Sequence, residues 1–516
     1  MGHRQRLEAL SGLLLVLFVA LLSSTVVSTA LPKIIGSLNG SQTQYTWVVT
    51  ATLLTATATT PIWGKIADLV NKKLLVQIAI VVFVVGSMIS GMSHNTEQLI
   101  AARAFQGIGV GGLQALVQVV IAAIIPPRER GRYNGYLGGV MALATVGGPL
   151  LGGVIADTSW LGWRWCFYVG VPVALVALVL LQLTLHVPTI RRPVRIDYLG
   201  ATLITAAVCT LLVWVSFVDS SFAWLSWQTE LMVPGAVVLL ALAVFVESRV
   251  AEPIIPLKIV TERTTSLAII TSLAVGTAMF GGAVFLGQYF QIGRGYSPTE
   301  SGLMTIPMMA GVLLTSIVAG RLVSRHGRVK PYIVAGTVVL VAGFAMLATV
   351  DHATPLVLVG AGMFLVGAGV GMSMQNLILA VQNTVQLRDV GAATSSVTFF
   401  RSLGGAAGVA VLGAVLARQV TTSINHQLAA AGLPTSGGTG GASALNVSAL
   451  PAPIRHIVQV AYGDATGHIF LISAIIGVVG VIAALLLKPA PLRTTLDKTA
   501  TATDRSEAPE PVSIEP

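Results

Sequence analysis

Apolar runs long enough to cross a lipid bilayer constrain this chain more than any other feature. A helix of about 20 residues spans a bilayer core of ~30 Å. Hydrophobic residues make up 54% of the chain and charged residues only 10%, against about 25% charged in soluble proteins. This composition excludes a water-soluble enzyme and a nucleic-acid binder. The sequence predicts fourteen transmembrane helices: 10–31, 45–63, 74–92, 98–125, 135–156, 165–186, 198–218, 231–248, 265–288, 301–320, 332–350, 356–380, 392–416 and 466–487.

The cations between these runs predict the orientation in the membrane. Of the 30 Lys and Arg residues, 23 fall on the side of the N-terminus and five on the other side, while Arg103 and Arg401 lie within runs. Because short cytoplasmic loops are enriched in Lys and Arg, both termini of this multi-pass cell-membrane protein are predicted to be cytoplasmic. The first run is too long for a signal-peptide core, so we interpret it as an uncleaved span.

The cysteines and histidines form no cluster typical of an enzyme or a metal site. Cys166 and Cys209 both fall in apolar runs, which indicates neither a disulfide framework nor a metal centre. The eight histidines scatter over termini, loops and helix ends. We therefore expect no catalytic residue, no bound metal and no cofactor.

A long internal repeat indicates duplicated halves, which in transporters usually enclose a central substrate cavity. The segment Gly64–Lys73 after the second run resembles Gly320–Arg328 after the tenth. An offset of 256 residues relates Gly148 to Gly404 and Gly152 to Gly408, and an offset of 260 relates Gly107, Gly109 and Gly111 to Gly367, Gly369 and Gly371. The predicted organisation is a six-helix half (1–186), a two-helix linker (187–264), a second six-helix half (265–488) with a long outer loop (417–464), and a disordered cytoplasmic tail (489–516).

Several motifs resemble those of the major facilitator superfamily, and specifically its fourteen-helix drug:proton antiporter branch. The resemblance implies an all-α integral membrane protein with the major facilitator fold, in which two six-helix bundles are joined by two extra linker helices. The matching segments are the loop signature Gly64–Lys73, the fourth-helix residues Arg103, Gln106, Gly107 and Gly109, the antiporter-like signature Gly148–Gly153, Trp163–Tyr168 before the sixth helix, and Ala392–Gly405 in the thirteenth.

The resemblance also implies which residues take part in gating. The acidic residue of the loop signature is Asp68, and an ion pair that forms in only one conformation would bias an alternating-access equilibrium. Plain helix packing by the glycines and a solvated loop charge remain alternatives. The gating or conformational candidates are Asp68, Lys72, Lys73, Arg103, Gln106, Gly148, Pro149, Gly152 and Gly153.

Carboxylates are absent from the middle of every predicted span. Many members of the resembled branch have an acidic residue in the first helix where this chain has Ser23, and a serine does not cycle a proton in the physiological range. The remaining candidate proton carriers are Asp68, Asp157 and Glu300, of which Glu300 also has the spacing of a capping box. Two embedded arginines without an embedded anion favour neutral amphipathic or anionic substrates over permanent cations.

Polar residues inside the spans are candidates for substrate or ion contact. Burying an arginine at the bilayer centre costs ~2.5–3.5 kcal/mol, so Arg103 and Arg401 should face the interior and have partners. Interhelical hydrogen bonding explains the uncharged candidates equally well. The substrate or coupling candidates are Arg401, Ser23, Gln114, Gln118 and Asn376.

The resemblance implies a secondary active transporter, and not an enzyme, that exports amphipathic small molecules or drugs across the cell membrane by proton antiport and alternating access. Multidrug efflux and antibiotic resistance are the expected biological roles. Export of a dedicated lipid, siderophore or antibiotic-like metabolite on the same fold is the alternative, because function depends on the cavity. The expected partners are the small-molecule substrate, protons and the lipid bilayer, with no nucleic acid, and the protein is expected to be a monomer.

Overall fold

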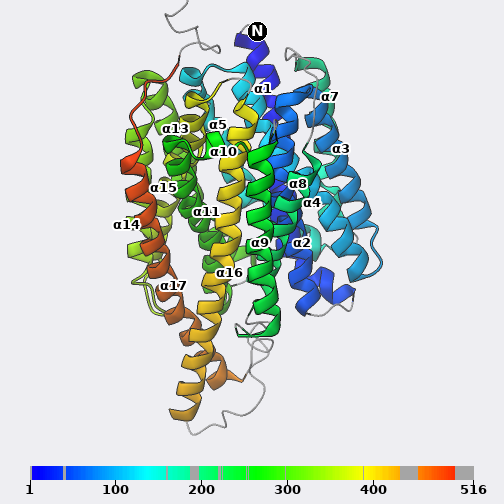
Figure 1. The fold of residues 1–516 in the computed structure, drawn as a ribbon. Coiled ribbons are helices and arrows are strands. Elements are labelled where there is room, and N and C mark those ends of the chain that lie inside the picture. The colour runs from blue at the N-terminus through cyan, green and yellow to red at the C-terminus, as the bar shows by residue number, and fades with distance from the viewer. Residues whose placement is uncertain are drawn as a thin grey trace, which may run out of the picture.

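The computed structural model describes the helical body of the chain. It describes residues 3–38, 42–158, 161–185, 197–218, 222–223, 225–250, 253, 255–296, 298–386, 389–430 and 451–493. Figure 1 shows that the long helices run along one common direction, with the N-terminus of α1 at one end of the bundle. We call the end at which α1 begins and α17 ends the terminal end.

Every long element of the first half and the linker is α-helical, as the apolar runs predict. Pro127 and Pro256 lie at helix starts, where a missing N–H removes no intrahelical bond. The elements are α1 (His3–Ser37), α2 (Gln42–Leu69), α3 (Lys72–Gly91), α4 (Thr96–Ile124), α5 (Pro127–Asp157), α6 (Trp165–Tyr168), α7 (Gly170–Thr184), α8 (Tyr198–Phe217), α9 (Trp227–Arg249) and α10 (Leu257–Val260).

The second half continues the same pattern, with one π-helical turn at the end of α11. Gly327 ends α13 in the left-handed conformation (φ 68°), which glycine adopts without steric cost. The elements are α11 (Arg263–Gln288), η1 (Tyr289–Gly293), α12 (Pro298–Met304), α13 (Ile306–His326), α14 (Lys330–Leu347), α15 (Leu356–Thr384), α16 (Val390–Ala430) and α17 (Ala452–Leu486).

These elements are consistent with fourteen spans. Within the described residues, 11 helical segments are long and apolar enough to cross a membrane. Two of these segments combine a pair of consecutive helices: α6 with α7, and α12 with α13. The three further predicted spans coincide with α2, α5 and α8. The all-α membrane fold is therefore confirmed, while the exact count of fourteen stays a prediction.

The helices of the first half pack around α4, which lies between α2 and α3. A side chain at Gly107 would bring its Cβ within 2.5 Å of the Thr52 carbonyl oxygen on α2, and one at Gly109 within 2.6 Å of the Phe83 nitrogen on α3. Only glycine permits such close backbone approach, so these residues fix how deeply α4 sits between its neighbours.

The second half repeats this arrangement around α15, which lies between α13 and α14. Gly367 faces the Met308 backbone of α13, and a Cβ at Gly369 would lie 2.6 Å from the Gly336 carbonyl oxygen on α14. The two sets of glycines related by the 260-residue offset thus allow the same close approach between helices. Helices α5 with α13, and α2 with α16, join the two halves (Figure 1).

Two segments differ from the sequence expectation. The predicted outer loop 417–464 is partly helical, because α16 continues to Ala430 and α17 begins at Ala452; both helices extend past the rest of the bundle at the end opposite the N-terminus (Figure 1). Val420, Ile424 and Leu428 are buried at helical spacing, and this stripe stabilises the extension. The predicted disordered tail is ordered at its start, where Leu492 is buried; residues 494–516 lie outside the described chain.

Candidate functional site

Asp68 joins the two halves at the terminal end. Its two carboxylate oxygens accept hydrogen bonds from the backbone nitrogens of Gly391 (2.8 Å) and Ala392 (2.7 Å) at the start of α16. A carboxylate at a helix N-terminus satisfies free N–H groups and interacts favourably with the helix dipole. The predicted partners Lys72 and Lys73 play smaller parts: the Lys73 ammonium donates to the Gln182 carbonyl oxygen on α7 at 2.7 Å, within the first half.

Arg130 forms a second contact between the halves, and the sequence did not single it out. Its guanidinium is 4% exposed and donates to the carbonyl oxygens of Ile125 (2.7 Å) and Ala122 (2.6 Å), which belong to its own half. The third bond crosses to the Gln382 side chain on α15 at 2.7 Å, and Gln382 in turn donates to Thr394 on α16. In the sequence Arg130 is one cation of a basic loop, and no spacing separates it from its neighbours.

A third contact between the halves lies deeper in the bundle. The Gln118 amide on α4 donates to the Gln375 amide oxygen on α15 at 3.1 Å, and both side chains are buried. Gln114, one turn away on α4, is half-buried. Asn376 donates to the Met372 carbonyl oxygen of its own helix, while its amide oxygen has no partner among the described residues. We call the bonds of Asp68, Arg130 and Gln118 to the second half the terminal-end contacts.

A buried polar cluster lies inside the first half, around Arg103. The guanidinium donates to the Gln106 amide oxygen one turn along α4. The Gln106 amide nitrogen donates to Ser87 on α3 (2.7 Å) and to Ser23 on α1 (3.4 Å). The structure therefore brings together three residues that the sequence proposed separately. Ser23 is linked to Arg103 through the Gln106 amide.

This cluster leaves part of the arginine unsatisfied. The Nε atom of Arg103 is buried and has no hydrogen-bond partner in the described chain. The nearest ring is Phe167, whose centroid lies 6.0 Å from the guanidinium carbon. A buried donor without an acceptor costs ~1–3 kcal/mol, so Arg103 retains a capacity to bind an acceptor.

Arg401 is less satisfied still. It lies on α16, is 7% exposed, and forms no hydrogen bond through its guanidinium in the described part of the protein; its Nη1 atom is fully buried. Its side-chain stem lies against α11, where a Cβ at Gly276 would be 3.1 Å from the Arg401 Cγ atom. The sequence expectation that a buried arginine finds a partner is therefore not met within these residues.

The fifth-helix signature packs against α1. A Cβ on Gly148 would overlap the Thr25 side chain, and the Thr25 hydroxyl donates to the Ala144 carbonyl oxygen at 3.1 Å. Helix α5 continues from Pro127 to Asp157 through Pro149. Gly152 is buried and Gly153 half-buried, while the side chains of Pro149 and Asp157 lie outside the described set. For Gly148 this geometry supports the helix-packing alternative.

The segment Lys488–Arg493, which we call the strap, crosses the terminal end of the second half. The Asn383 side chain at the end of α15 donates to the Pro491 carbonyl oxygen (3.1 Å) and accepts from the Arg493 nitrogen (3.0 Å). The Leu492 nitrogen donates to the Gly327 carbonyl oxygen at 2.9 Å. The strap thus ties α17 to α15 and to the turn between α13 and α14.

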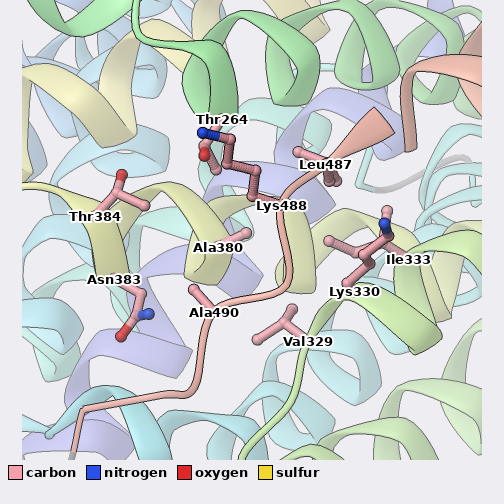
Figure 2. Close-up of a pocket in the computed structure, with 10 residues that line it drawn as sticks. All are labelled: Thr264, Val329, Lys330, Ile333, Ala380, Asn383, Thr384, Leu487, Lys488 and Ala490. Atoms are coloured by element: carbon pink, nitrogen blue, oxygen red, sulfur yellow. The ribbon is translucent and has the colours of Figure 1, made fainter. Parts of the chain in front are cut away.

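A small cavity lies beneath the strap. Figure 2 shows Lys488 and Ala490 on one side of it and Asn383 and Thr384 on another, with Lys330 close by. Its volume of about 20 Å³ holds roughly one water molecule. Ligand pockets typically enclose ~300–1,000 Å³, so this cavity is a packing feature and not a drug site.

Comparison with known proteins identifies the family. The sequence profile of the Major Facilitator Superfamily matches residues 13–409. The chain belongs to this superfamily. This transporter is 36% identical over 501 residues to the uncharacterized MFS-type transporter Rv1877 of Mycobacterium tuberculosis, covering 96% of this chain and 72% of the relative.

A second relative and a solved structure agree with this assignment. The multidrug transporter protein MdtP of Bacillus subtilis is 35% identical, covering 80% of this chain and 75% of MdtP. The proton:xylose symporter XylE matches in structure with a TM-score of 0.58 over 92% of this transporter and 95% of that chain, at 15% identity, which shows the fold alone. The predicted family and fold class and the prediction that the protein is not an enzyme are confirmed.

Proposed function

We propose that this transporter exports amphipathic small molecules across the cytoplasmic membrane by alternating access, with its terminal end in the cytoplasm. The observation that carries the proposal is the set of terminal-end contacts. Asp68, Arg130 and Gln118 each bond from the first half to the second, on α16 or α15. Two packed halves that part at one end and close at the other form the two-state element that alternating access needs.

The relatives support the direction and the class of cargo. MdtP is a multidrug transporter, and fungal proteins that share about 30% of this sequence, such as dotC of Dothistroma septosporum, are efflux pumps. The excess of cations on the terminal side supports a cytoplasmic location of that end. A cytoplasmic gate that is closed in the structure corresponds to the stage at which an exporter releases cargo outside.

We further propose that inward proton movement drives export, with Asp68 as the titrating group. Its carboxylate sits between two helices when the contact is closed and meets water when the halves part. A carboxyl group whose surroundings change during the cycle changes its proton affinity, which is the requirement for coupling. Glu300 lies exposed in the first turn of α12, at the other end of the bundle.

Transport by purified protein in proteoliposomes tests this function. A pH gradient and a potassium-diffusion potential are imposed separately while a fluorescent drug is followed across the membrane. Proton-coupled export predicts drug accumulation that requires the protein and rises when the imposed pH gradient or potential drives protons out of the compartment in which the drug accumulates. Drug movement that is identical in protein-free vesicles would contradict export altogether, and movement indifferent to the pH gradient would contradict proton coupling alone.

A further inference from the structure

We infer that the substrates of this transporter are amphipathic molecules with one carboxylate or sulfonate group, and that Arg401 is the residue that binds this group. The inference rests on the proposed export function and names its substrate class. It depends on the hydrogen bonding of the two embedded arginines and on the helix faces that carry them.

Each arginine shares a helix face with a residue of the polar network that joins the halves. Arg103 is eleven and fifteen residues before Gln114 and Gln118, which corresponds to three and four helical turns and therefore to one face of α4. Gln118 on that face bonds across to α15. Arg401 shares a face of α16 with Thr394, which bonds to the same Gln382 that Arg130 reaches from the first half. Major facilitator cavities lie between the halves, and the inference requires that the Arg401 guanidinium borders that region.

The hydrogen bonding distinguishes Arg401 from Arg103. Arg103 is held by Gln106, which is itself anchored on Ser87. Arg401 has no acceptor within the described residues, although its Nη1 atom is fully buried. A buried cation without a hydrogen-bond acceptor is costly. Its free N–H donors are therefore available to bind the acceptor atoms of a ligand. The planar guanidinium matches the two oxygens of a carboxylate or sulfonate.

The rest of the membrane region agrees with an anionic substrate. Between Glu8 and Asp68, between Asp68 and Glu97, and between Asp389 and Asp464 the chain has no acidic residue at all. A cationic drug would therefore meet two fixed positive charges and no carboxylate in these helices.

An anion at Arg401 also changes which step the membrane potential acts on. The loaded site is neutral, whereas the empty site carries one positive charge. The inside-negative potential then favours the return of the empty site toward the cytoplasm, because a positive charge moves down the potential in that step. The net export of one negative charge per cycle is therefore carried by this return step.

Three fluorescent probes, one anionic, one neutral and one cationic, test the inference in proteoliposomes. The monoanion is 8-anilinonaphthalene-1-sulfonate, the neutral probe is its sulfonamide analogue, and the cation is ethidium. We expect the sulfonate to be transported at least about tenfold faster than the sulfonamide, since a hydrogen bond to a charged group discriminates by roughly this factor or more. Ethidium should be slower still.

Variants at Arg401 identify the contact. Arg401→Gln should lower sulfonate transport about tenfold or more and leave sulfonamide transport unchanged, while Arg401→Lys keeps part of the sulfonate transport. Arg418→Gln is the matched control, because Arg418 is exposed on the same helix beyond the bilayer. Thermal unfolding in detergent supplies a second readout: replacing an unpartnered buried charge should leave the melting temperature unchanged or raised.

Each alternative outcome has a separate meaning. Equal rates for sulfonate and sulfonamide, preference for ethidium, or full sulfonate transport by Arg401→Gln would overturn the inference while leaving export intact. Loss of all three probes together with a lower melting temperature in Arg401→Gln would assign Arg401 to the fold and also overturn it. Failure of the wild-type protein to move any probe under any gradient would contradict the proposed function itself.

Discussion

The two halves of the transporter share their packing and differ in their polar chemistry. Helix α4 sits between α2 and α3, and α15 sits between α13 and α14, with Gly107 and Gly367 making the equivalent close approaches. The same 260-residue offset that relates these glycines places Met363 at the position of Arg103. The 256-residue offset places Ser324 at the position of Asp68.

This difference separates structural positions from functional ones within a single molecule. The backbone contact that a glycine allows is needed wherever two helices must meet closely, so both halves keep it. A buried charge is costly, and the repeat positions of Arg103 and Asp68 are occupied by the uncharged Met363 and Ser324. The glycines of the repeat therefore serve the packing of both halves, whereas Asp68, Arg103 and Arg401 are the candidates for a role in transport.

The largest expected effect is the loss of folded protein when the shared packing is disturbed. Gly107→Ala and Gly367→Ala should each destabilise the protein by ~1–3 kcal/mol or prevent folding, because the added carbon meets backbone atoms that cannot move aside. Thermal unfolding in detergent measures the change. The control is Gly235→Ala on α9, where a Cβ meets nothing within 4 Å. A strong effect in only one half would break the structural equivalence of α4 and α15.

The next effect concerns Asp68 and its counterpart Ser324. Asp68→Asn removes the charge and one of two acceptor oxygens from the start of α16, which should weaken the closed contact by ~1.5–3 kcal/mol and lower transport about tenfold. Ser324→Ala should have little effect on transport. Labelling of a Ser395→Cys substitution from the cytoplasmic side would report opening, since a Cβ on neighbouring Gly64 would touch Ser395. Equal transport losses at both positions would contradict the assignment of gating to the first half.

A smaller effect is expected inside the two halves. Gln106→Leu leaves the Arg103 guanidinium without its side-chain acceptor, and we expect a cost of ~1–3 kcal/mol in the free energy of unfolding. Met363→Leu, at the repeat position of Arg103, conserves volume and should cost less than ~1.5 kcal/mol. Unfolding curves of both variants measure the difference, and a stability of Gln106→Leu equal to that of the unsubstituted protein would contradict the dependence of Arg103 on Gln106.

The smallest effect concerns the strap, whose hydrogen bonds among the described residues go to the second half. The residue of α4 that is equivalent to Asn383 in the repeat is Ala123, so Asn383→Ala makes α15 match α4 at this position. Loss of the two bonds to Pro491 and Arg493 should cost ~0.5–1.5 kcal/mol per bond and speed proteolysis of the C-terminal tail. Transport should change less than twofold. A severe transport defect would show that the strap takes part in gating.

Much of the fold could be predicted from local sequence, because a bilayer imposes a length and an apolar composition on every spanning helix. Helices α3, α14 and α15 fall close to the predicted runs. The predictions failed where an apolar stripe continued beyond the membrane, as at Val420 and Ile424 of α16, and where backbone bonds held a polar tail, as at Leu492. In both places the stabilising contacts come from segments distant in sequence.

The candidate site was predicted unevenly for the same reason. Asp68, Arg103 and Gln106 carry recognisable spacing, and Arg401 is conspicuous as a charge within an apolar run. Arg130, Gln375 and Gln382 have no such signal, because their role depends on partners more than 230 residues away.

The sequence by itself determined that this is a membrane protein and which family it belongs to, since these follow from hydropathy and short motifs. Only the tertiary structure decided which polar groups are paired. It joined Ser23 to Arg103 through Gln106, closed the terminal end with Asp68 and Arg130, and left Arg401 without an acceptor among the described residues. The physical reason is that hydrogen bonds require atoms to meet within about 3 Å, and such meetings between distant helices depend on packing.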